Sequence, residues 1–353
     1  MTNWLTATGT AIALMTLLGA PVQARAEATL DWMVKAHGDG EHNAFTDLVR
    51  WRDHYYLCFR HGTAHNSMDG EIRVMRSTDM KAWQPCATLS TLGDDRDPHF
   101  TIADDRLYVY FGVWDLVHWD GPKTPDRGSV RSHFASTADG QTWSKVQGVY
   151  EPGWWLWRVR YYDGTFYSAA YTAVRPRPTV RETRLLRSDD GLNWDLAGLV
   201  TNERMAGEAD FWFEGDRMRL ITRTGDKPGD AALLLSDPAL EQWQRTDTGT
   251  LVHSPVVVRW KARYFISGRG RGDDGFVTKV WELIGDRLEA LITLPSGGDT
   301  GYSGLLVDPA TADADAPALF ASWYSQHARD QEPNATKNTA SIYVARIILP
   351  GAN

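Results

Sequence analysis

A carboxylate and a guanidinium face each other across a β-hairpin in the segment GEADFWFEGDRMRLITR, residues 207–223. Gly215 and Asp216 form the centre of its polar turn, and counting outward equally along both strands pairs Glu208 with Arg223. As an exposed cross-strand ion pair, these two residues would contribute roughly 0.2–1 kcal/mol. They could also do chemistry, because a carboxylate can take a proton from a nucleophile and an arginine can bind an anionic substrate.

Six hairpins of this kind recur along the chain, each pairing two apolar strands across a polar turn. They are FTDLVRWRDHYYLCFR, PHFTIADDRLYVYFG, WRVRYYDGTFYSAAY, ADFWFEGDRMRLITR, PVVVRWKARYFISGR and YSGLLVDP…ALFASWYS. A second series places Ser or Thr, Asp and Trp at fixed spacing in STDMKAW, TADGQTW and SDDGLNW, with SDPALEQW as a looser copy. Its period of about 50 residues, with six hairpins, predicts an all-β, six-bladed β-propeller of four-stranded antiparallel blades. TLDWMV near the N-terminus and SIYVARIIL near the C-terminus are expected to pair and close the ring.

The net charge and the N-terminal segment limit the partners and the cellular location that the protein can have. The net charge of −8 argues against nucleic-acid or anionic-membrane partners, which select basic surfaces. AIALMTLLGA, followed by Ala24-Arg25-Ala26, has the pattern of a secretory signal peptide cleaved after Ala26. We therefore expect a signal peptide at 1–26, a single propeller domain at 27–353 and a secreted or periplasmic location. No later segment is apolar enough to span a membrane, and the protein is expected to be a monomer.

The two cysteines, Cys58 and Cys86, fall on the second and fourth strands of one predicted sheet. Strands two apart lie roughly 9–10 Å from each other, which exceeds the Cα separation that a disulfide tolerates. Two buried free thiols are therefore predicted.

Propeller topology places the start of each innermost strand and the end of the next strand on the same face of the disc. The innermost strands bring His42, Asn43, Arg96, Asp97, Arg158, Glu208, His253 and Tyr302 to this face. The second strands bring Arg60, His61, His65, Trp114, Tyr171, Arg223, Arg269, Tyr324 and His327. The two sets are polar, aromatic and cationic, whereas the middles of the strands are apolar, so one end of the central channel is predicted to be a site.

With these motifs the chain resembles the sialidase-like superfamily of six-bladed propellers. Its Ser/Thr-x-Asp…Trp turns are similar to the Asp boxes of that superfamily. The resemblance implies that Tyr302, in SGGDTGYSGLLV, is a catalytic nucleophile activated by Glu208. It implies that Arg223 and Arg269 bind a substrate carboxylate, and that Asp69 is the general acid and base. The sequence looks closer to uncharacterised bacterial exo-sialidase-like proteins than to true sialidases.

The first blade departs from the family pattern. Sialidases open with an arginine in an R-I-P run, whereas this chain reads HNAFTDL. Arginines on the same face could replace the missing guanidinium, and histidines could add substrate contacts; the candidates are Arg60, Arg96, Arg158, His61 and His65. Asp97 is expected to orient Arg96 in a solvated turn. His61 and His65 lack a third partner at metal-ligand spacing, so no metal is predicted. No nucleotide or phosphate fingerprint is present, so no cofactor is predicted.

Three functions follow as expectations. The first is an exo-acting glycoside hydrolase that removes a terminal acidic or deoxy sugar. The second is a polysaccharide lyase that uses arginine to neutralise a uronate carboxylate and His61, His65, His118 or Tyr302 as base and acid. The third is a non-catalytic sugar-binding propeller, which the Trp-rich WWLW at 154–157 would suit. In each case the partner is a carbohydrate.

Overall fold

The computed structural model describes residues 1, 27–91, 93–115, 128–175, 180–203, 207–225 and 230–351. The predicted signal peptide, apart from Met1, and His118 lie outside the described residues. No helix in the described part of the chain has the length and apolar character needed to cross a membrane.

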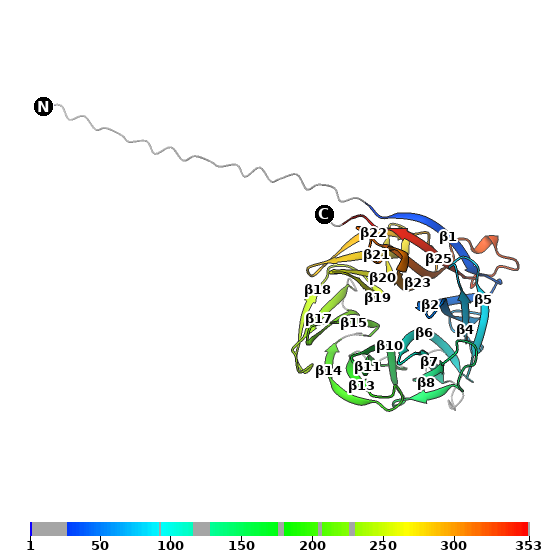
Figure 1. The fold of residues 1–353 in the computed structure, drawn as a ribbon, viewed down its shortest axis with the longest axis horizontal. Helices are drawn as coiled ribbons and strands as arrows, with labels where there is room; N and C mark the ends of the chain where they lie inside the picture. The colour runs from blue at the N-terminus through cyan, green and yellow to red at the C-terminus, as the bar shows by residue number, and fades with distance from the viewer. Residues whose placement is uncertain are drawn as a thin grey trace.

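Six antiparallel sheets stand around a central axis as the blades of a propeller (Figure 1). The innermost strands are β2 (His42–Trp51), β6 (Asp94–Ala103), β10 (Trp154–Tyr162), β15 (Ala209–Glu214), β19 (His253–Trp260) and β23 (Thr300–Val307). The second strands are β3 (His54–Gly62), β7 (Arg106–Asp115), β11 (Thr165–Thr172), β16 (Arg217–Arg223), β20 (Arg263–Gly272) and β24 (Ala318–Ser325). The third strands are β4 (Glu71–Ser77), β8 (Gly128–Thr137), β13 (Arg181–Ser188), β17 (Ala231–Ser236), β21 (Gly275–Ile284) and β25 (Ser341–Ile348).

The outermost strands are β5 (Gln84–Leu89), β9 (Gln147–Val149), β14 (Asp195–Glu203), β18 (Trp243–Asp247), β22 (Arg287–Leu294) and β1 (Thr29–His37). In the second blade β9 is short, and β12 (Val174–Arg175) pairs with the other end of β8. Two 3₁₀ turns, η1 (Pro309–Thr311) and η2 (Arg329–Gln331), complete the regular structure of the described residues. The predicted six-bladed propeller is confirmed.

The ring closes within the sixth blade, as predicted. Strand β1 is the outer neighbour of β25, in a register that runs from Thr29 opposite Ile348 to His37 opposite Ile342. Figure 1 shows the two strands side by side at the rim, although they come from opposite ends of the chain. Pairing the N-terminal strand with the C-terminal blade joins the first and last parts of the ring and covers the edge of β25.

Apolar side chains from neighbouring blades pack between the sheets, and the Ser/Thr-x-Asp turns fasten the outer strands. In the first blade the Asp79 carboxylate accepts hydrogen bonds from the backbone N–H groups of Lys81 and Ala82. The Trp83 indole N–H donates a hydrogen bond to the carbonyl of Met80. These turns follow the third strands, so they lie on the face opposite the ends of the second strands. Cys58 on β3 and Cys86 on β5 are both free, as predicted, although Cys86 is only partly buried.

Five of the six innermost strands contain an irregularity at the same level. The register with the second strand shifts after Ala44, Arg96, Leu156, His253 and Gly301. Four of the residues that follow have a positive φ: Phe45 (58°), Asp97 (52°), Ser254 (51°) and Tyr302 (52°). A left-handed conformation at a residue other than glycine costs about 1–3 kcal/mol and is concentrated at functional sites. These bulges turn Asp97, Trp157 and Tyr302 into the mouth of the channel.

Candidate active site

A cavity of about 240 Å³ opens at the channel mouth, and all six blades contribute side chains to it. Small-molecule sites typically enclose roughly 300–1,000 Å³, so this volume suits a single sugar ring better than an extended chain. Four arginines line the cavity together with two carboxyl groups, and aromatic rings cover one wall. The predicted position of the site, at the ends of the second strands, agrees with this cavity.

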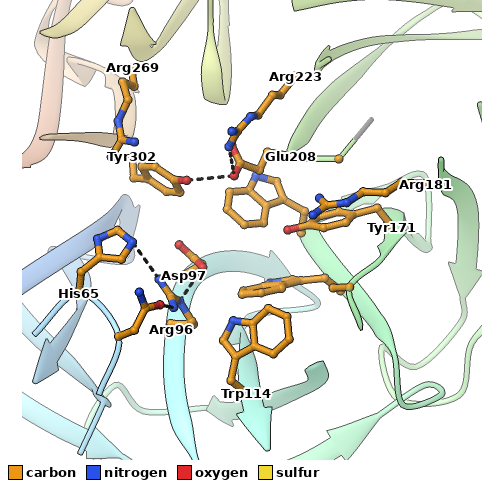
Figure 2. A pocket seen from close by; sticks show the side chains of 15 residues that line it. His65, Arg96, Asp97, Trp114, Tyr171, Arg181, Glu208, Arg223, Arg269 and Tyr302 are labelled. Atoms are coloured by element: carbon orange, nitrogen blue, oxygen red, sulfur yellow. Dashed lines mark hydrogen bonds and ion pairs between the residues drawn. The ribbon is translucent and has the colours of Figure 1, made fainter. Parts of the chain in front are cut away.

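Glu208, Arg223 and Tyr302 form a hydrogen-bonded triad at one side of the cavity (Figure 2). The Tyr302 hydroxyl donates to Glu208 Oε1 over 2.9 Å, and Arg223 Nη1 donates to the same oxygen over 2.8 Å. The second oxygen, Oε2, accepts the backbone N–H of Ser254 at 2.9 Å. The cross-strand pairing of Glu208 with Arg223 is confirmed by the backbone hydrogen bond from Arg223 N–H to the Glu208 carbonyl.

The expectation of an exposed ion pair was wrong. Glu208 is 8% exposed and Tyr302 9% exposed, because the channel mouth is enclosed by six blades rather than by one hairpin. Burial by itself would raise the pKa of Glu208, but Arg223, His253 and the Tyr302 hydroxyl outweigh it and lower the pKa to about 2. Burial, together with the Glu208 carboxylate, raises the pKa of Tyr302 well above its usual value, despite nearby arginines. At neutral pH the pair is therefore a carboxylate and a neutral phenol.

Arg269 lies beside Tyr302, with its guanidinium 5.0 Å from the centre of the tyrosine ring. Its Nη2 donates to Asp299 Oδ1 at 3.0 Å and to the Tyr324 hydroxyl at 2.7 Å. Its Nε donates to the carbonyl of Thr300. The Nε and Nη2 groups of the guanidinium are therefore occupied by protein groups, and Arg269 also lines the cavity.

Asp299 also joins two histidines, and we call His42, His65 and Asp299 the Asp299 cluster. Asp299 Oδ2 lies 3.1 Å from His42 Nε2 and 2.6 Å from His65 Nδ1. His65 Nε2 lies 3.5 Å from Arg96 Nη2. Because an arginine can only donate, this contact places the His65 proton on Nδ1, where it is shared with Asp299.

The Asp299 cluster contains the donor atoms of a two-histidine, one-carboxylate metal site, all within 4.8 Å of one another. Sequence spacing could not find it, because Asp299 lies 234 residues from His65. Two observations favour a hydrogen-bonded cluster instead. Asp299 already forms an ion pair with Arg269. A metal on His65 Nδ1 would also force a proton onto Nε2, against the Arg96 guanidinium.

Arg96 and Asp97 occupy the floor of the cavity (Figure 2). Arg96 Nη1 donates to Asn66 Oδ1 at 2.7 Å, and its Nε lies 3.5 Å from Asp97 Oδ2. The expected solvated turn is not found: this segment begins β6, and both side chains are almost fully buried. Burial raises the pKa of Asp97 to about 7, although Arg96 opposes the shift.

An aromatic wall faces this charged side. Trp155 and Tyr171 stack with a centroid distance of 6.0 Å, and Trp114 and Trp157 extend the wall on either side. Flat apolar rings of this kind pack against the C–H faces of sugars while leaving the hydroxyl groups to polar partners. The WWLW segment thus contributes to an enclosed cavity wall rather than to an exposed sugar-binding surface.

Comparisons with known proteins agree on the architecture. A protein of unknown function from Dyadobacter fermentans DSM 18053 superposes with a TM-score of 0.72 at 17% identity, over 92% of this chain and 99% of that one. Trypanosoma rangeli sialidase in complex with sialic acid has a TM-score of 0.60 at 15% identity, over 93% of this chain and 59% of that chain. The endosialidase of phage phi92 has a TM-score of 0.61 at 12% identity, over 93% of this chain and 70% of that chain. No family model and no curated protein matches the sequence.

The chain has the sialidase-like propeller fold. The resemblance stated from the sequence is therefore confirmed at the level of the fold.

Of the predicted site residues, the sialidase-like propeller brings seven to the lining of the cavity: Tyr302, Glu208, Arg223, Arg269, Arg96, Asp97 and His65. Asp69 does not reach it. Its carboxylate accepts hydrogen bonds from the backbone N–H and the hydroxyl of Thr63, where it fastens the loop between β3 and β4. Hydrogen bonds from the Ser67 side chain and from Thr63 outweigh burial and hold the pKa of Asp69 below its usual value, which is the wrong direction for an acid.

Arg60, Arg158 and His61 are also outside the cavity, and each is occupied by protein groups. Arg60 is fully buried and donates to Asp94 Oδ1 at 2.8 Å. Arg158 is bound deeper in the channel by Asp47. His61 turns outward, with its Nε2 3.1 Å from Asp39 Oδ2.

Two charged residues of the site were missed. Arg181, at the start of β13, lines the cavity with its guanidinium over the ring of Tyr171. Asp299 immediately precedes β23. The starts of third strands lie on the same face as the ends of second strands, so extending the topological argument by one strand would have found Arg181.

Proposed function

We propose that this protein is a glycoside hydrolase that releases a terminal, carboxylate-bearing sugar, with Tyr302 as its nucleophile. The observation that carries the proposal is the 2.9 Å hydrogen bond from the Tyr302 hydroxyl to Glu208 inside the cavity, with Arg223 on the same carboxylate oxygen. The nucleophile and its base are in hydrogen-bond contact, and the base is in turn held by Arg223 and by the Ser254 N–H.

The resting protonation states define how this pair works. A neutral phenol beside a carboxylate of low basicity does not transfer its proton spontaneously. The proton moves to Glu208 as the phenol oxygen forms its bond to the anomeric carbon, since bond formation makes the hydroxyl far more acidic. A neutral nucleophile also approaches an anionic sugar without charge repulsion.

The charges of the cavity support an acidic sugar. Four guanidinium groups face two carboxyl groups, and one of those carboxyls, Asp97, has a pKa raised by burial to about 7. The positive excess favours a substrate carboxylate, which arginine can bind through two parallel hydrogen bonds. The first inner strand reads HNAFTDL and has no arginine in place of the first-blade arginine of sialidases, so the sugar need not be sialic acid.

Covalent trapping tests this function. Trypanosoma rangeli sialidase is known as a covalent intermediate with 2,3-difluorosialic acid. The protein should be incubated with 2,3-difluorosialic acid, its 2-keto-3-deoxy-nononic acid analogue and 2-deoxy-2-fluoroglucuronyl fluoride, and its intact mass measured. A mass increase of one glycosyl group on the peptide that contains Tyr302, lost in Tyr302→Phe, supports the proposal. Hydrolysis of the glycosides without any Tyr302 adduct would refute the nucleophile assignment, and binding without turnover would indicate a lectin.

A polysaccharide lyase is the second candidate, because the short contact between His65 and Asp299 at the cavity edge resembles the carboxylate–histidine pair of a general base. Elimination would leave an unsaturated uronate, whose ultraviolet absorbance separates it from a hydrolysis product. We also propose export to the periplasm or the medium, which N-terminal sequencing of the mature protein tests: the first residue should be Glu27.

A further inference from the structure

The hydrolysis proposed above needs a group that protonates the leaving oxygen, and Asp69 is placed outside the cavity. Among the described residues that line the cavity, the carboxyl groups are Glu208 and Asp97. Glu208 is fully engaged by Tyr302, Arg223 and the Ser254 N–H. Asp97 is the carboxyl group that remains.

Asp97 is aimed into the cavity by the backbone. It occupies the bulge of β6 with a φ of 52°, which is the conformation that Tyr302 adopts in the bulge of β23. Figure 2 shows its carboxyl group on the floor of the cavity, across from the Tyr302 hydroxyl. The same local device therefore presents the nucleophile from one blade and a carboxyl group from another.

The hydrogen bonding of Asp97 is incomplete. Asp97 is 4% exposed, and within the described part of the chain its Oδ1 has no hydrogen-bond partner. Its Oδ2 has only the long 3.5 Å contact with Arg96 Nε. A buried polar atom without a partner is uncommon and calls for an explanation. A protonated Oδ1 whose O–H group donates to a glycosidic oxygen of the substrate would explain the missing partner.

The charged and titratable groups around Asp97 leave it protonated at mildly acidic pH. They come from several blades: Arg96 and Asp94 from β6, Arg60 from β3, and, across the cavity, Glu208, Tyr171 and Tyr302. Burial is the largest influence and raises the pKa to about 7, Glu208 and Asp94 add to it, and Arg96 and Arg60 oppose it.

We propose that Asp97 is the proton donor of the proposed glycosidase reaction, on which this inference rests. In the first step Tyr302 Oη bonds to the anomeric carbon, its proton passes to Glu208, the glycosidic C–O bond breaks, and Asp97 protonates the departing oxygen. In the second step a water attacks the anomeric carbon and gives its proton to Asp97. The bond to Tyr302 breaks, and the phenol recovers its proton from Glu208. The enzyme returns to its starting state, and the configuration of the sugar is retained.

Two other roles would leave Asp97 in the same place. Asp97 could serve only to position the Arg96 side chain, or it could accept a hydrogen bond from a sugar hydroxyl. Neither depends on the leaving group, whereas a proton donor matters most when the leaving oxygen is a poor one. This difference separates the roles.

The experiment compares 4-nitrophenyl and methyl glycosides of N-acetylneuraminic acid, 2-keto-3-deoxy-nononic acid and glucuronic acid. For Asp97→Asn, kcat/KM on the methyl glycoside should fall 10²–10⁴-fold. On the 4-nitrophenyl glycoside, whose leaving group needs no proton, it should change less than about tenfold. Added azide should raise kcat of the variant on the activated substrate, because azide replaces water without needing a base.

Asp94→Asn is the matched control, since Asp94 is buried on the same strand and contacts the same Arg96 from outside the cavity. It should affect both substrates equally, and Asp69→Asn should show no dependence on the leaving group. Equal losses on both substrates for Asp97→Asn, or the leaving-group pattern in Asp69→Asn, would overturn the inference while leaving the proposed function intact. A wild-type protein inactive on the whole panel would overturn both.

A measurement on the wild-type protein guards against a variant that does not fold. With the methyl glycoside, kcat/KM should fall as pH rises through about 7, since the proton that Asp97 donates is then lost. With the 4-nitrophenyl glycoside this basic limb should be absent. The same limb on both substrates would contradict the proton-donor role.

Discussion

Replacing Glu208 by Gln tests whether the triad at the channel mouth is catalytic or only structural. Gln keeps the size of the side chain but removes the charge and converts one acceptor oxygen into a donor. Glu208 accepts three hydrogen bonds, from Tyr302, Arg223 and the Ser254 N–H, so at least one of them must be lost. General-base assistance supplies 10²–10⁴-fold in rate, or about 3–5 kcal/mol at 1.36 kcal/mol per tenfold. We expect kcat of Glu208→Gln to fall by that factor.

The effect on stability must be separated from the effect on rate. Because the pair is buried, breaking it should lower the free energy of unfolding by about 3–5 kcal/mol, and not by the fraction of a kcal/mol expected of an exposed pair. Asp210→Asn is the matched control. Asp210 lies two residues further along the chain, is fully buried, accepts the Val257 N–H at 2.8 Å and forms an ion pair with Arg160, but it does not line the cavity.

The assay is a kinetic cycle with Tyr302→Phe, run below the unfolding transition of each variant. Groups that act as one unit lose their effect together, so Glu208→Gln on the Tyr302→Phe background should be nearly silent in kcat. Asp210→Asn should be destabilised like Glu208→Gln, yet retain kcat. The reasoning is refuted if the two losses in the cycle are additive, or if Asp210→Asn loses as much activity as Glu208→Gln.

Three further predictions follow from the structure. Cys58 and Cys86 should each react with a thiol reagent in denaturant without reductant. If neither cysteine reacts, the two are joined by a disulfide and the prediction is wrong. Asp97→Asn should gain about 3 kcal/mol of unfolding free energy over wild type between pH 5 and pH 8, measured by urea titration. The sign follows because a folded pKa of about 7 exceeds the unfolded value near 4, so the wild-type carboxyl contributes stability below pH 4 that is lost as pH rises through 7. Dialysis against EDTA should leave turnover unchanged, and a loss restored by Zn²⁺ would show that the Asp299 cluster is a metal site.

Sequence reasoning was sufficient for the architecture and for one pair of the site. The repeat period and the six hairpins predict the propeller because each blade is a local unit that recurs. Glu208 and Arg223 could be paired by counting because β15 and β16 run in regular register. Topology placed Tyr302 on the face of the site, but its role as a nucleophile came only from the family resemblance.

The direction of side chains near the bulges could not be predicted. Topology gives the end of a strand that a residue occupies, but a register shift changes which way its side chain points. Arg158 directly follows Trp157 in the bulge of β10, and it turns into the channel toward Asp47 while the tryptophan lines the cavity. Partners distant in sequence determine where the other side chains point: Arg60 pairs with Asp94, and His65 pairs with Asp299.

The channel mouth carries costs that a structural propeller would not need. Asp97 and Tyr302 hold a strained backbone, Asp97 keeps a buried oxygen without a partner among the described residues, and several charges are removed from water. Replacing buried charge networks by apolar side chains of similar volume is often neutral or stabilising. These costs lie together at one end of the channel, around a cavity of the size of one sugar ring, whereas ring closure by β1 and β25 is regular strand pairing. The proposed catalytic role would account for this distribution, because strain and burial there set the direction of Tyr302 and the proton affinity of Asp97. It follows that Asp97→Asn should gain stability relative to the wild-type protein as pH rises from 5 to 8, and that below pH 7 it should be the poorer catalyst on a methyl glycoside.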